Sequence, residues 1–195
     1  MNIIKRIING NEYWYDANGN EIYYKKSNGE EHWYEYDANG NVIHYKNANG
    51  HEEWYEYDTN GNQTYFKDSN GVEGWYQYAN DKLLHYKDST GYEEWYQYAN
   101  DKLIHYKDTT GYEEWHEYND NGNRIYCKNS NGYEQWFDYD DNGNIIHYTD
   151  SNGNEVWYEY DSNGNIIHSK NSNGTIKTKS DYLLEKLLNE YIKTS

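Results

Sequence analysis

Short runs in which aromatic and polar residues alternate make up most of the chain, and turn-forming residues separate these runs. In Trp33–Asp37, for example, Trp and Glu occupy alternate positions with Tyr between them. A period of two is typical of a β-strand, and the runs have the length of strands rather than of helices. The dipeptides Asn39-Gly40 and Asn49-Gly50 interrupt the pattern. Because Asn and Gly both tolerate a positive φ angle, each Asn-Gly indicates a β-hairpin.

One Trp recurs every 19 to 21 residues, and this spacing defines a unit of about 21 residues that holds two turns. Periods of this size mark repeat architectures. We therefore predict an all-β protein in which eight tandem hairpin repeats form one long antiparallel meander, either a curved single sheet or a solenoid-like ribbon. A two-layered sandwich would need more Leu, Ile and Val than the chain contains. The marker residues are Trp14, Trp33, Trp54, Trp75, Trp95, Trp115, Trp136 and Trp157.

The strand register predicts two different faces. A two-residue loop at Asn39-Gly40 would pair Tyr36 with Ile43 and Tyr34 with Tyr45 across the hairpin. If the second turn has three residues and a bulge, the faces stay the same in the next repeat, whereas a two-residue loop would exchange them. We favour the three-residue loop because it keeps one face continuous. That face would carry Tyr34, Tyr36, Ile43 and Tyr45, and the opposite face would carry Trp33, Glu35, His44 and Lys46.

The two ends of the chain differ from the repeats. We expect a capping strand in residues 1–10, eight repeats in residues 11–174 and a short C-terminal helix in residues 180–193. Ser180 or Asp181 is expected to cap the helix. Terminal repeats need a cover, so the helix is expected to lie over the last sheet edge; docking to a partner is its alternative role.

Two units differ from the others in their first turn. Ala79-Asn80-Asp81-Lys82 and Ala99-Asn100-Asp101-Lys102 stand where the other units have Asp-x-Asn-Gly-Asn. We expect a different turn type at both places.

Composition and charge exclude several classes of protein. The chain has 195 residues, 19% aromatic residues, no Pro and a formal net charge of −17. This charge excludes a simple nucleic-acid binder, because phosphate contacts need Lys and Arg, and it disfavours binding to an anionic membrane. No apolar run has the length of a membrane span or of a signal-peptide core, so we expect a cytoplasmic protein. The single cysteine, Cys127, excludes an internal disulfide framework.

The residues that could hold a metal are repeated rather than clustered. Equivalent positions in successive repeats lie two strands apart, about 9.6 Å, which is too far for a shared metal. In the Asp-x-Asn-Gly-Asn turns the Gly is in the wrong position for an EF-hand loop. We therefore predict no metal and no cofactor, and we expect the His side chains to pack beside Glu and Trp. These residues are His44, His85, His105, His147 and His168.

Pairs of neighbouring Glu residues could suggest a catalytic acid/base site, but their repetition argues against one. Catalysis needs one asymmetric site with differently tuned carboxylates, whereas Glu52-Glu53, Glu93-Glu94 and Glu113-Glu114 repeat the same arrangement. Cys127 has no matching catalytic signature and is expected to be an inert, packed thiol. We predict that the protein is not an enzyme.

The string Tyr-Asp-x-Asn-Gly-Asn begins at Tyr36, Tyr57 and Tyr160, and a variant with Asp at the third position begins at Tyr139. Together with the period of about 21 residues, this string resembles the YD repeats of Rhs-type proteins. Those repeats form β-sheet shells around toxin domains. The resemblance covers residues 11–174 and implies the β-repeat architecture. Each unit here also has a Trp and a second Asn-Gly-type turn, so encapsulation is not carried over.

Charge and aromatic residues together suggest a binding protein. Our leading hypothesis is an acidic inhibitor that mimics nucleic acid and engages a basic protein, such as a nuclease or a CRISPR effector, in the manner of anti-CRISPR or toxin-immunity proteins. The alternative is a carbohydrate- or surface-binding or structural YD-repeat scaffold that uses the Trp and Tyr rows. Oligomeric state stays open. The candidate partner-binding residues are Glu52, Glu53, Trp54, Glu93, Glu94, Trp95, Glu113, Glu114 and Trp115.

Overall fold

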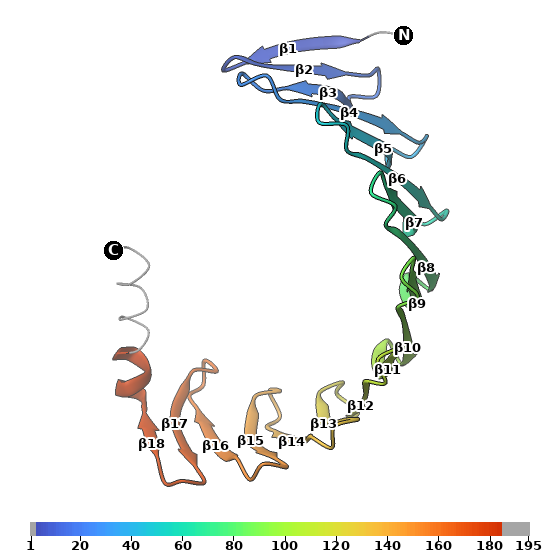
Figure 1. Cartoon of the computed structure of the whole chain (residues 1–195). Coiled ribbons are helices and arrows are strands. Elements are labelled where there is room, and N and C mark those ends of the chain that lie inside the picture. Colours follow the sequence, from blue (N-terminus) through green and yellow to red (C-terminus); the bar gives the residue numbers. More distant parts are fainter. Residues whose placement is uncertain (1–2, 185–195) are drawn as a thin grey trace. The chain divides into compact units, whose positions relative to one another are not determined.

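The computed structural model describes residues 3–184, and these residues form eighteen antiparallel β-strands of one sheet and a short helix at 179–184 (Figure 1). The predicted all-β antiparallel meander is therefore confirmed. The chain divides into two compact units, one that ends at Trp95 and one that begins at Tyr96. The boundary falls inside strand β10 (Glu93–Ala99).

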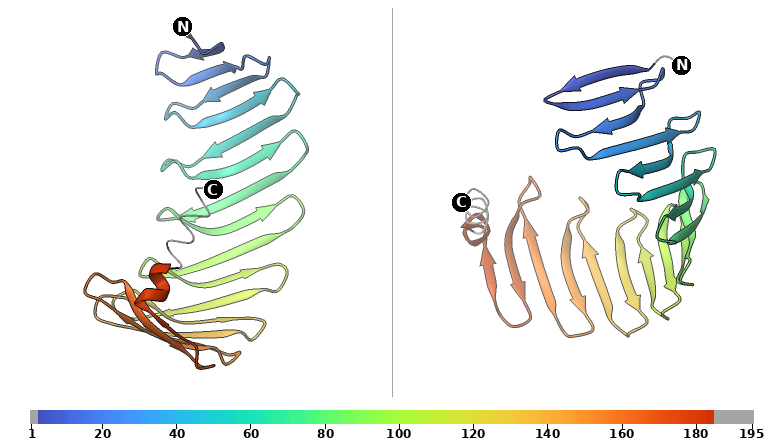
Figure 2. Two further views of the ribbon diagram at one scale, coloured as in Figure 1. Left: turned by 90° about the vertical axis from the view of Figure 1, so that its left-hand side faces the viewer. Right: turned by 45° about the horizontal axis from the view of Figure 1, so that its top comes forward.

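In the first unit, each strand pairs with the strand that follows it in the sequence (Figure 2). This order needs only hairpin turns and no crossover. The strands are β1 (Ile4–Ile8), β2 (Asn11–Tyr15), β3 (Glu21–Lys25), β4 (Glu31–Tyr36), β5 (Val42–Asn47), β6 (Glu52–Tyr57), β7 (Gln63–Asp68), β8 (Glu73–Ala79), β9 (Lys82–Asp88) and the start of β10 (Glu93–Ala99).

The second unit continues the same pattern, and its strands also pair in sequence order from β11 onward. Its last strand is the shortest, with three residues. The strands are β11 (Lys102–Asp108), β12 (Glu113–Tyr118), β13 (Arg124–Asn129), β14 (Glu134–Tyr139), β15 (Ile145–Asp150), β16 (Glu155–Tyr160), β17 (Ile166–Asn171) and β18 (Ile176–Thr178).

The Asn-Gly turn after β4 has three loop residues, so the predicted two-residue loop is wrong. The Asp37 N–H donates to the Asn41 carbonyl at 2.9 Å, and the Gly40 N–H donates to the Asp37 carbonyl at 3.2 Å. Gly40 has a φ of 87°, whereas Asn39 does not have a positive φ. The carboxylate of Asp37 accepts the N–H groups of Asn39 and Asn41, each at 2.9 Å, and this Asx arrangement stabilises the longer turn.

A β-bulge follows from this turn and corrects the predicted pairing of Tyr36. Tyr36 lies opposite Val42, and the register then skips Ile43. Val42 lines a hollow together with Tyr34 and other Tyr side chains, so Val42 takes the place that was predicted for Ile43. Beyond the bulge, Tyr34 pairs with Tyr45, Glu35 with His44 and Trp33 with Lys46, as predicted.

The second turn of each repeat confirms the three-residue loop that we favoured. After β5, the Asn47 N–H donates to the His51 carbonyl at 3.0 Å, and Gly50 has a φ of 85°.

The different turn type that we expect at Ala79–Lys82 is also confirmed. At Asn80 and Asp81 both φ angles are positive, 50° and 59°, and Ala79 pairs with Lys82, which leaves a loop of two residues. The missing loop residue explains why this unit is one residue shorter.

The Tyr of the Tyr-Asp motif links one hairpin to the preceding one. The Tyr160 hydroxyl donates to the backbone carbonyl of Ile145 at 2.8 Å, and Tyr139 donates to that of Arg124 at 2.7 Å. Tyr36 makes the equivalent bond, and so does Tyr118, although Asn119 follows it in place of Asp. The acceptors Ile145, Arg124 and Glu21 lie beside bulges, where the register of the preceding hairpin shifts. A bulge disrupts the ladder locally, and the Tyr hydroxyl supplies the donor that the ladder lacks there.

The helix begins at residue 179, one residue before the expected start, and the part of the expected helix beyond 184 lies outside the described residues. The N–H and the hydroxyl of Thr178 donate to the Asp181 carboxylate at 2.7 and 2.8 Å, so Asp181 caps the helix from its first turn. Tyr182 extends over β17, and its hydroxyl donates to the Ser169 hydroxyl at 2.6 Å. Among the described residues no helix is long and apolar enough to cross a membrane.

Replacing Tyr160 with Phe should lower the free energy of unfolding by about 1 kcal/mol, because the Ile145 carbonyl loses its hydroxyl donor. Urea titration followed by Trp fluorescence measures this change. The matched control is Tyr15→Phe, since Tyr15 also precedes an Asp but its hydroxyl has no hydrogen bond to a described residue. Equal losses in the two variants would contradict the proposed link between hairpins.

The carboxylates in the turns make the free energy of unfolding depend on pH in the acidic range. The Asn154 side-chain amide and backbone N–H hold the pKa of Asp150 down at about 2, assisted by the Tyr148 and Tyr133 hydroxyls. The Asn165 N–H, together with Lys179, also holds the pKa of Asp161 at about 2. A pKa lowered in the folded state means that the unfolded chain binds more protons. The stabilisation is therefore complete above the unfolded pKa of about 4 and is lost as the pH falls to about 2.

We expect Asp150→Asn to reduce this acid-dependent loss. An Asn side chain already serves in the same turn position at Asn129, where its carbonyl accepts the N–H groups of Asn131 and Tyr133 at 3.0 and 3.1 Å. The variant therefore keeps the backbone bonds and removes the ionisable group. Its amide NH2 also replaces the carboxylate oxygen that accepts the Asn154 amide and the Tyr133 and Tyr148 hydroxyls, so we expect a lower stability at pH 7 as well as a weaker pH dependence. Urea titrations at pH 7, 4, 3 and 2 measure the effect. A pH dependence as steep as that of the unchanged protein would contradict it.

Candidate functional site: the Trp face

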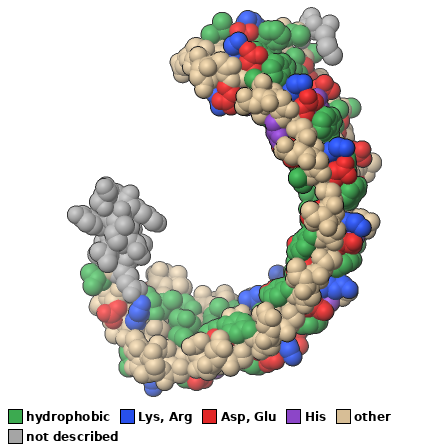
Figure 3. All heavy atoms as spheres, viewed as in Figure 1, with side chains coloured by type: hydrophobic (Ala, Val, Ile, Leu, Met, Phe, Trp, Pro, Cys, Tyr) green, Lys and Arg blue, Asp and Glu red, His purple; other side chains and the backbone are tan. Residues whose placement is uncertain are grey.

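Alternation along the strands gives the sheet two faces of different chemistry. We call the Trp face the one that carries Trp33, Glu35 and Lys46 and their equivalents in the other repeats. We call the Tyr face the one that carries Tyr34 and Tyr45 and their equivalents. Acidic, basic and apolar side chains are mixed along the visible surface of the first unit (Figure 3).

On the Trp face, side chains from five neighbouring strands form one cross-strand row. In the row that runs from β4 to β8, Glu35 lies opposite His44, His44 opposite Trp54, Trp54 opposite Lys67, and Lys67 opposite Glu73. The next row has the same order, with Tyr65 in the place of the His and Trp75 as its Trp. These two rows thus begin and end with a carboxylate, and each holds one Trp and one Lys.

An aromatic side chain from the neighbouring strand packs against each of these Trp rings. The rings of His44 and Trp54 are stacked, with centroids 5.2 Å apart and planes 12° apart. His147 and Trp157 have the same separation and an angle of 18°. Six Trp side chains nevertheless remain between 36% and 40% exposed. This uniform exposure leaves a ring surface open to solvent in six of the eight repeats. The six are Trp33, Trp54, Trp75, Trp115, Trp136 and Trp157.

The carboxylates that precede the Trp residues are occupied by internal partners. Glu52 accepts a hydrogen bond from Lys46 at 2.7 Å and lies 3.1 Å from His44 Nε2. These two contacts, the Lys46 bond first, lower the pKa of Glu52. Glu93 is placed in the same way, 2.9 Å from His85 and 3.1 Å from Lys87. Much of the negative charge of these residues is therefore balanced within the sheet.

The carboxylates that follow the Trp residues are far more accessible. The side chains of Glu35 and Asp138 are 70% exposed and that of Glu159 is 69% exposed. Their contacts are to His Nδ1 atoms, at 3.5 Å for His44 and 3.1 Å for His147. Each lies two residues after an exposed Trp on the same strand and therefore on the same face. The face thus presents an open ring and an open carboxylate together at Trp33, Trp136 and Trp157, whereas Gln77 and Gln97 take the place of the carboxylate after Trp75 and Trp95.

Strand alternation separates the candidate residues that were predicted from the sequence. Glu52, Glu93 and Glu113 lie on the Trp face with Trp54, Trp95 and Trp115, but Glu53, Glu94 and Glu114 lie on the Tyr face. There the second residue of each pair accepts a Tyr hydroxyl. The donors are Tyr55 for Glu53, Tyr92 for Glu94 at 2.9 Å, and Tyr112 for Glu114.

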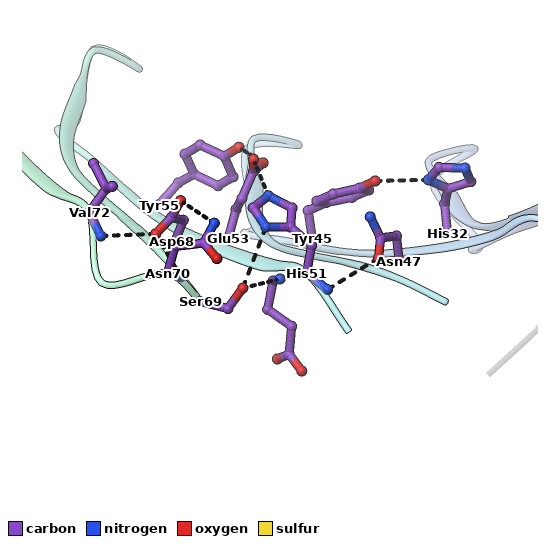
Figure 4. A network of polar contacts seen from close by, with 11 residues as sticks. His32, Tyr45, Asn47, His51, Glu53, Tyr55, Asp68, Ser69, Asn70 and Val72 are labelled. Atoms are coloured by element: carbon purple, nitrogen blue, oxygen red, sulfur yellow. Dashed lines mark hydrogen bonds and ion pairs between the residues drawn. The ribbon is translucent and has the colours of Figure 1, made fainter. Parts of the chain in front are cut away.

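A polar network around Glu53 shows how the Tyr face holds its acids (Figure 4). His51 Nε2 lies 2.9 Å from Glu53, and the Tyr55 hydroxyl donates to the other carboxylate oxygen. Burial and this bond to Glu53 raise the pKa of Tyr55 far above its usual value. Glu53 is therefore engaged within the sheet.

Sequence reasoning missed Glu35, Asp138 and Glu159, which the pattern Trp-x-Glu or Trp-x-Asp would have identified.

Two positions of the Tyr face break the row of aromatic pairs: Tyr158 lies opposite Ser169, and His116 lies opposite Cys127. The other repeats pair two aromatic rings there, such as Tyr34 and Tyr45 at 5.4 Å. His116 and Cys127 are 8% and 9% exposed. Burial lowers the pKa of His116 and raises the pKa of Cys127, so both groups are neutral at pH 7.

Within residues 3–184 no cluster of three or more His, Cys, Asp or Glu side chains could hold a metal ion.

Comparison with known proteins bears on the architecture. Residues 139–176 match the family model for the RHS Repeat. No curated protein matches the chain. Among solved structures, the chain is similar to the crystal structure of TcdB2-TccC3-Cdc42, with a TM-score of 0.62 and 16% identity over 76% of this chain and 10% of that one.

A second similar structure is the Tc holotoxin pore of Photorhabdus luminescens, with a TM-score of 0.54 and 17% identity over 86% of this chain and 10% of that one. At such low identity these similarities show the fold alone. The chain spans about a tenth of the length of these proteins. The resemblance to YD-repeat proteins of the RHS type is thereby confirmed for the β-repeat architecture, and residues 139–176 are the segment that matches the RHS repeat itself.

Proposed function

We propose that this chain is a non-catalytic binding protein whose Trp face engages a basic surface of another protein and blocks it. The observation that carries the proposal is the pairing of an exposed Trp ring with an exposed carboxylate two residues later, as in Trp33 and Glu35 or Trp157 and Glu159. The repetition of this pair suits a partner with many cationic side chains rather than a single small ligand.

Arg is the side chain that fits this pair best. Its guanidinium group stacks on aromatic faces, and it also forms two parallel hydrogen bonds with a carboxylate. A Trp and a Glu on one side of the same strand offer both contacts within reach of one Arg. A Lys would make a point contact with the carboxylate and a weaker contact with the ring.

The class of partner follows from charge. Proteins that act on nucleic acids present stripes of Lys and Arg to phosphate groups. A chain with a net charge of −17, in which the charge recurs with each repeat, can compete for such a stripe. The proposed role is therefore that of an anti-CRISPR or toxin-immunity type inhibitor that mimics nucleic acid, acting in the cytoplasm where a nuclease or CRISPR effector acts. Complementary charge would accelerate the association.

A carbohydrate- or surface-binding scaffold is the second candidate function. The uniform exposure of the Trp rings favours it, because sugars stack on open aromatic surfaces. Glycan binding would depend on the rings and not on charge. Retention on an immobilised glycan in 1 M salt would support this second function, whereas release of a basic partner by salt supports the first.

Neutralising the three open carboxylates with Glu35→Gln, Asp138→Asn and Glu159→Gln should weaken the binding of a nona-arginine peptide to the second unit about fivefold and reduce its salt dependence. Nine residues span at most about 30 Å, so one peptide can reach both Asp138 on β14 and Glu159 on β16, which lie two strands apart, whereas Glu35 belongs to the first unit. Two exposed ion pairs of roughly 0.5 kcal/mol each give about 1 kcal/mol, and 1.4 kcal/mol is a factor of ten. Quenching of Trp fluorescence measures the affinity in 50 and 300 mM salt.

The matched control removes three charges from the Tyr face, with Glu53→Gln, Glu94→Gln and Glu114→Gln. These carboxylates are engaged by Tyr hydroxyls, so this variant should bind the peptide with nearly unchanged affinity. The same loss in both variants would show that net charge alone attracts the peptide, and the Trp face would not be the site.

A further inference from the structure

The first strand of the sheet has an open edge that the proposed function does not use. β1 pairs with β2 along one edge, and no strand of residues 3–95 pairs with its other edge. All five residues of β1 are exposed, and Ile4, Ile7 and Ile8 have exposures of 49%, 69% and 50%. An edge strand of this kind offers unpaired backbone groups to another strand.

β1 also differs from the repeats in charge. Its sequence, Ile-Lys-Arg-Ile-Ile, is basic, whereas the repeats are acidic. On the paired edge, Lys5 lies 2.6 Å from Glu12 and its ammonium group lies 5.6 Å from the centre of the Trp14 ring. Arg6 lies over the ring of Tyr15 at 5.3 Å. The side chains of β1 therefore bind the acidic and aromatic side chains of a Trp-containing strand.

The register shows which strand would fit the open edge. Lys5 of β1 lies opposite Trp14 of β2, just as His44 of β5 lies opposite Trp54 of β6. β1 therefore has the same position relative to β2 as β5 has relative to β6. The other edge of β5 is covered by β4.

In the pairing of β4 with β5, a Trp-Tyr-Glu-Tyr segment places its Glu opposite His44, its first Tyr opposite Tyr45 and its Trp opposite Lys46. Transferred to β1, the same register places a Glu opposite Lys5, a Tyr opposite Arg6 and a Trp opposite Ile7. Each of these pairs brings together groups that attract each other.

We propose that the open edge of β1 accepts an acidic Trp-Tyr-Glu-Tyr strand from another polypeptide, which pairs antiparallel and extends the sheet. Main-chain hydrogen bonds would supply affinity, as in other cases of strand addition, and Lys5 and Arg6 would select an acidic strand. The site is an interaction surface distinct from the Trp face, and its ligand has the opposite charge from the partner proposed above.

A second copy of this chain does not fit the same edge. Two β1 strands would bring Lys5 and Arg6 of one copy against the same residues of the other, and like charges across strands repel. The far end of the sheet, β18, has three residues and carries Lys177, and the helix at 179–184 follows it directly. A head-to-tail contact would therefore also join two basic strands.

The test uses the full chain and a synthetic peptide that reproduces residues 51–58, which contain a Trp-Tyr-Glu-Tyr segment. We expect this peptide to bind, and a peptide with Glu56→Lys to bind at least fivefold more weakly, because the changed residue faces Lys5. The protein variant Lys5→Glu should restore binding of the changed peptide. Fluorescence anisotropy of labelled peptides measures affinity, and hydrogen exchange should show new protection at residues 4–8.

Three results would overturn the proposal: equal affinity of the two peptides, protection elsewhere than β1, or self-association of the chain in place of peptide binding. Because only the peptide changes in the first comparison, a folding defect cannot explain the outcome. The variant with Glu35→Gln, Asp138→Asn and Glu159→Gln should bind the peptide normally. Failure of the edge site is therefore distinguishable from failure of the proposed function of the Trp face.

Discussion

The whole structure depends on cross-strand side-chain pairs, because each unit has side chains on two faces and almost no interior. Cys127 is the one buried hydrophobic residue among those described. A protein with a thick core can rely on aliphatic burial, whereas here the pairs on each face must stabilise the strands, at roughly 0.2–1 kcal/mol for each pair. Aromatic rings suit this arrangement because one ring covers much of its partner. This is why Tyr and Trp replace Leu and Val throughout the repeats.

Turn chemistry allows the same pairs to form again in every repeat. The three-residue loop after β4 would shift the register by one position, and the bulge at Ile43 reverses that shift, so that Tyr34 still meets Tyr45. The Tyr-Asp motif serves both features. Its Asp caps the loop, and its Tyr hydroxyl satisfies a carbonyl beside the preceding bulge. The motif is thus a device for keeping the two faces constant along the chain.

Sequence periodicity was sufficient to predict the repeats, the strands and most of the pairing, since alternation and turn residues are local signals. It could not distinguish a two-residue from a three-residue loop at Asn39-Gly40, because both place Gly at a positive φ. The Asp before the turn, which accepts two N–H groups, decides the outcome. The candidate site was predicted less well. Glu52 and Glu53 are neighbours in sequence, but alternation places them on opposite faces, and only contacts in space show which acids are occupied.

The division between acids with internal partners and acids open to solvent explains how a strongly acidic sheet can be stable and still carry the binding site that we propose. On the Tyr face, Tyr hydroxyls hold the carboxylates, and on the Trp face Lys and His hold Glu52 and its equivalents. These internal partners offset repulsion between strands that carry the same sequence. The carboxylates two residues after Trp33, Trp136 and Trp157 contact His side chains and remain in solvent. The binding that we propose therefore involves acids that the sheet does not need for its own cohesion, and these acids lie beside rings that remain exposed.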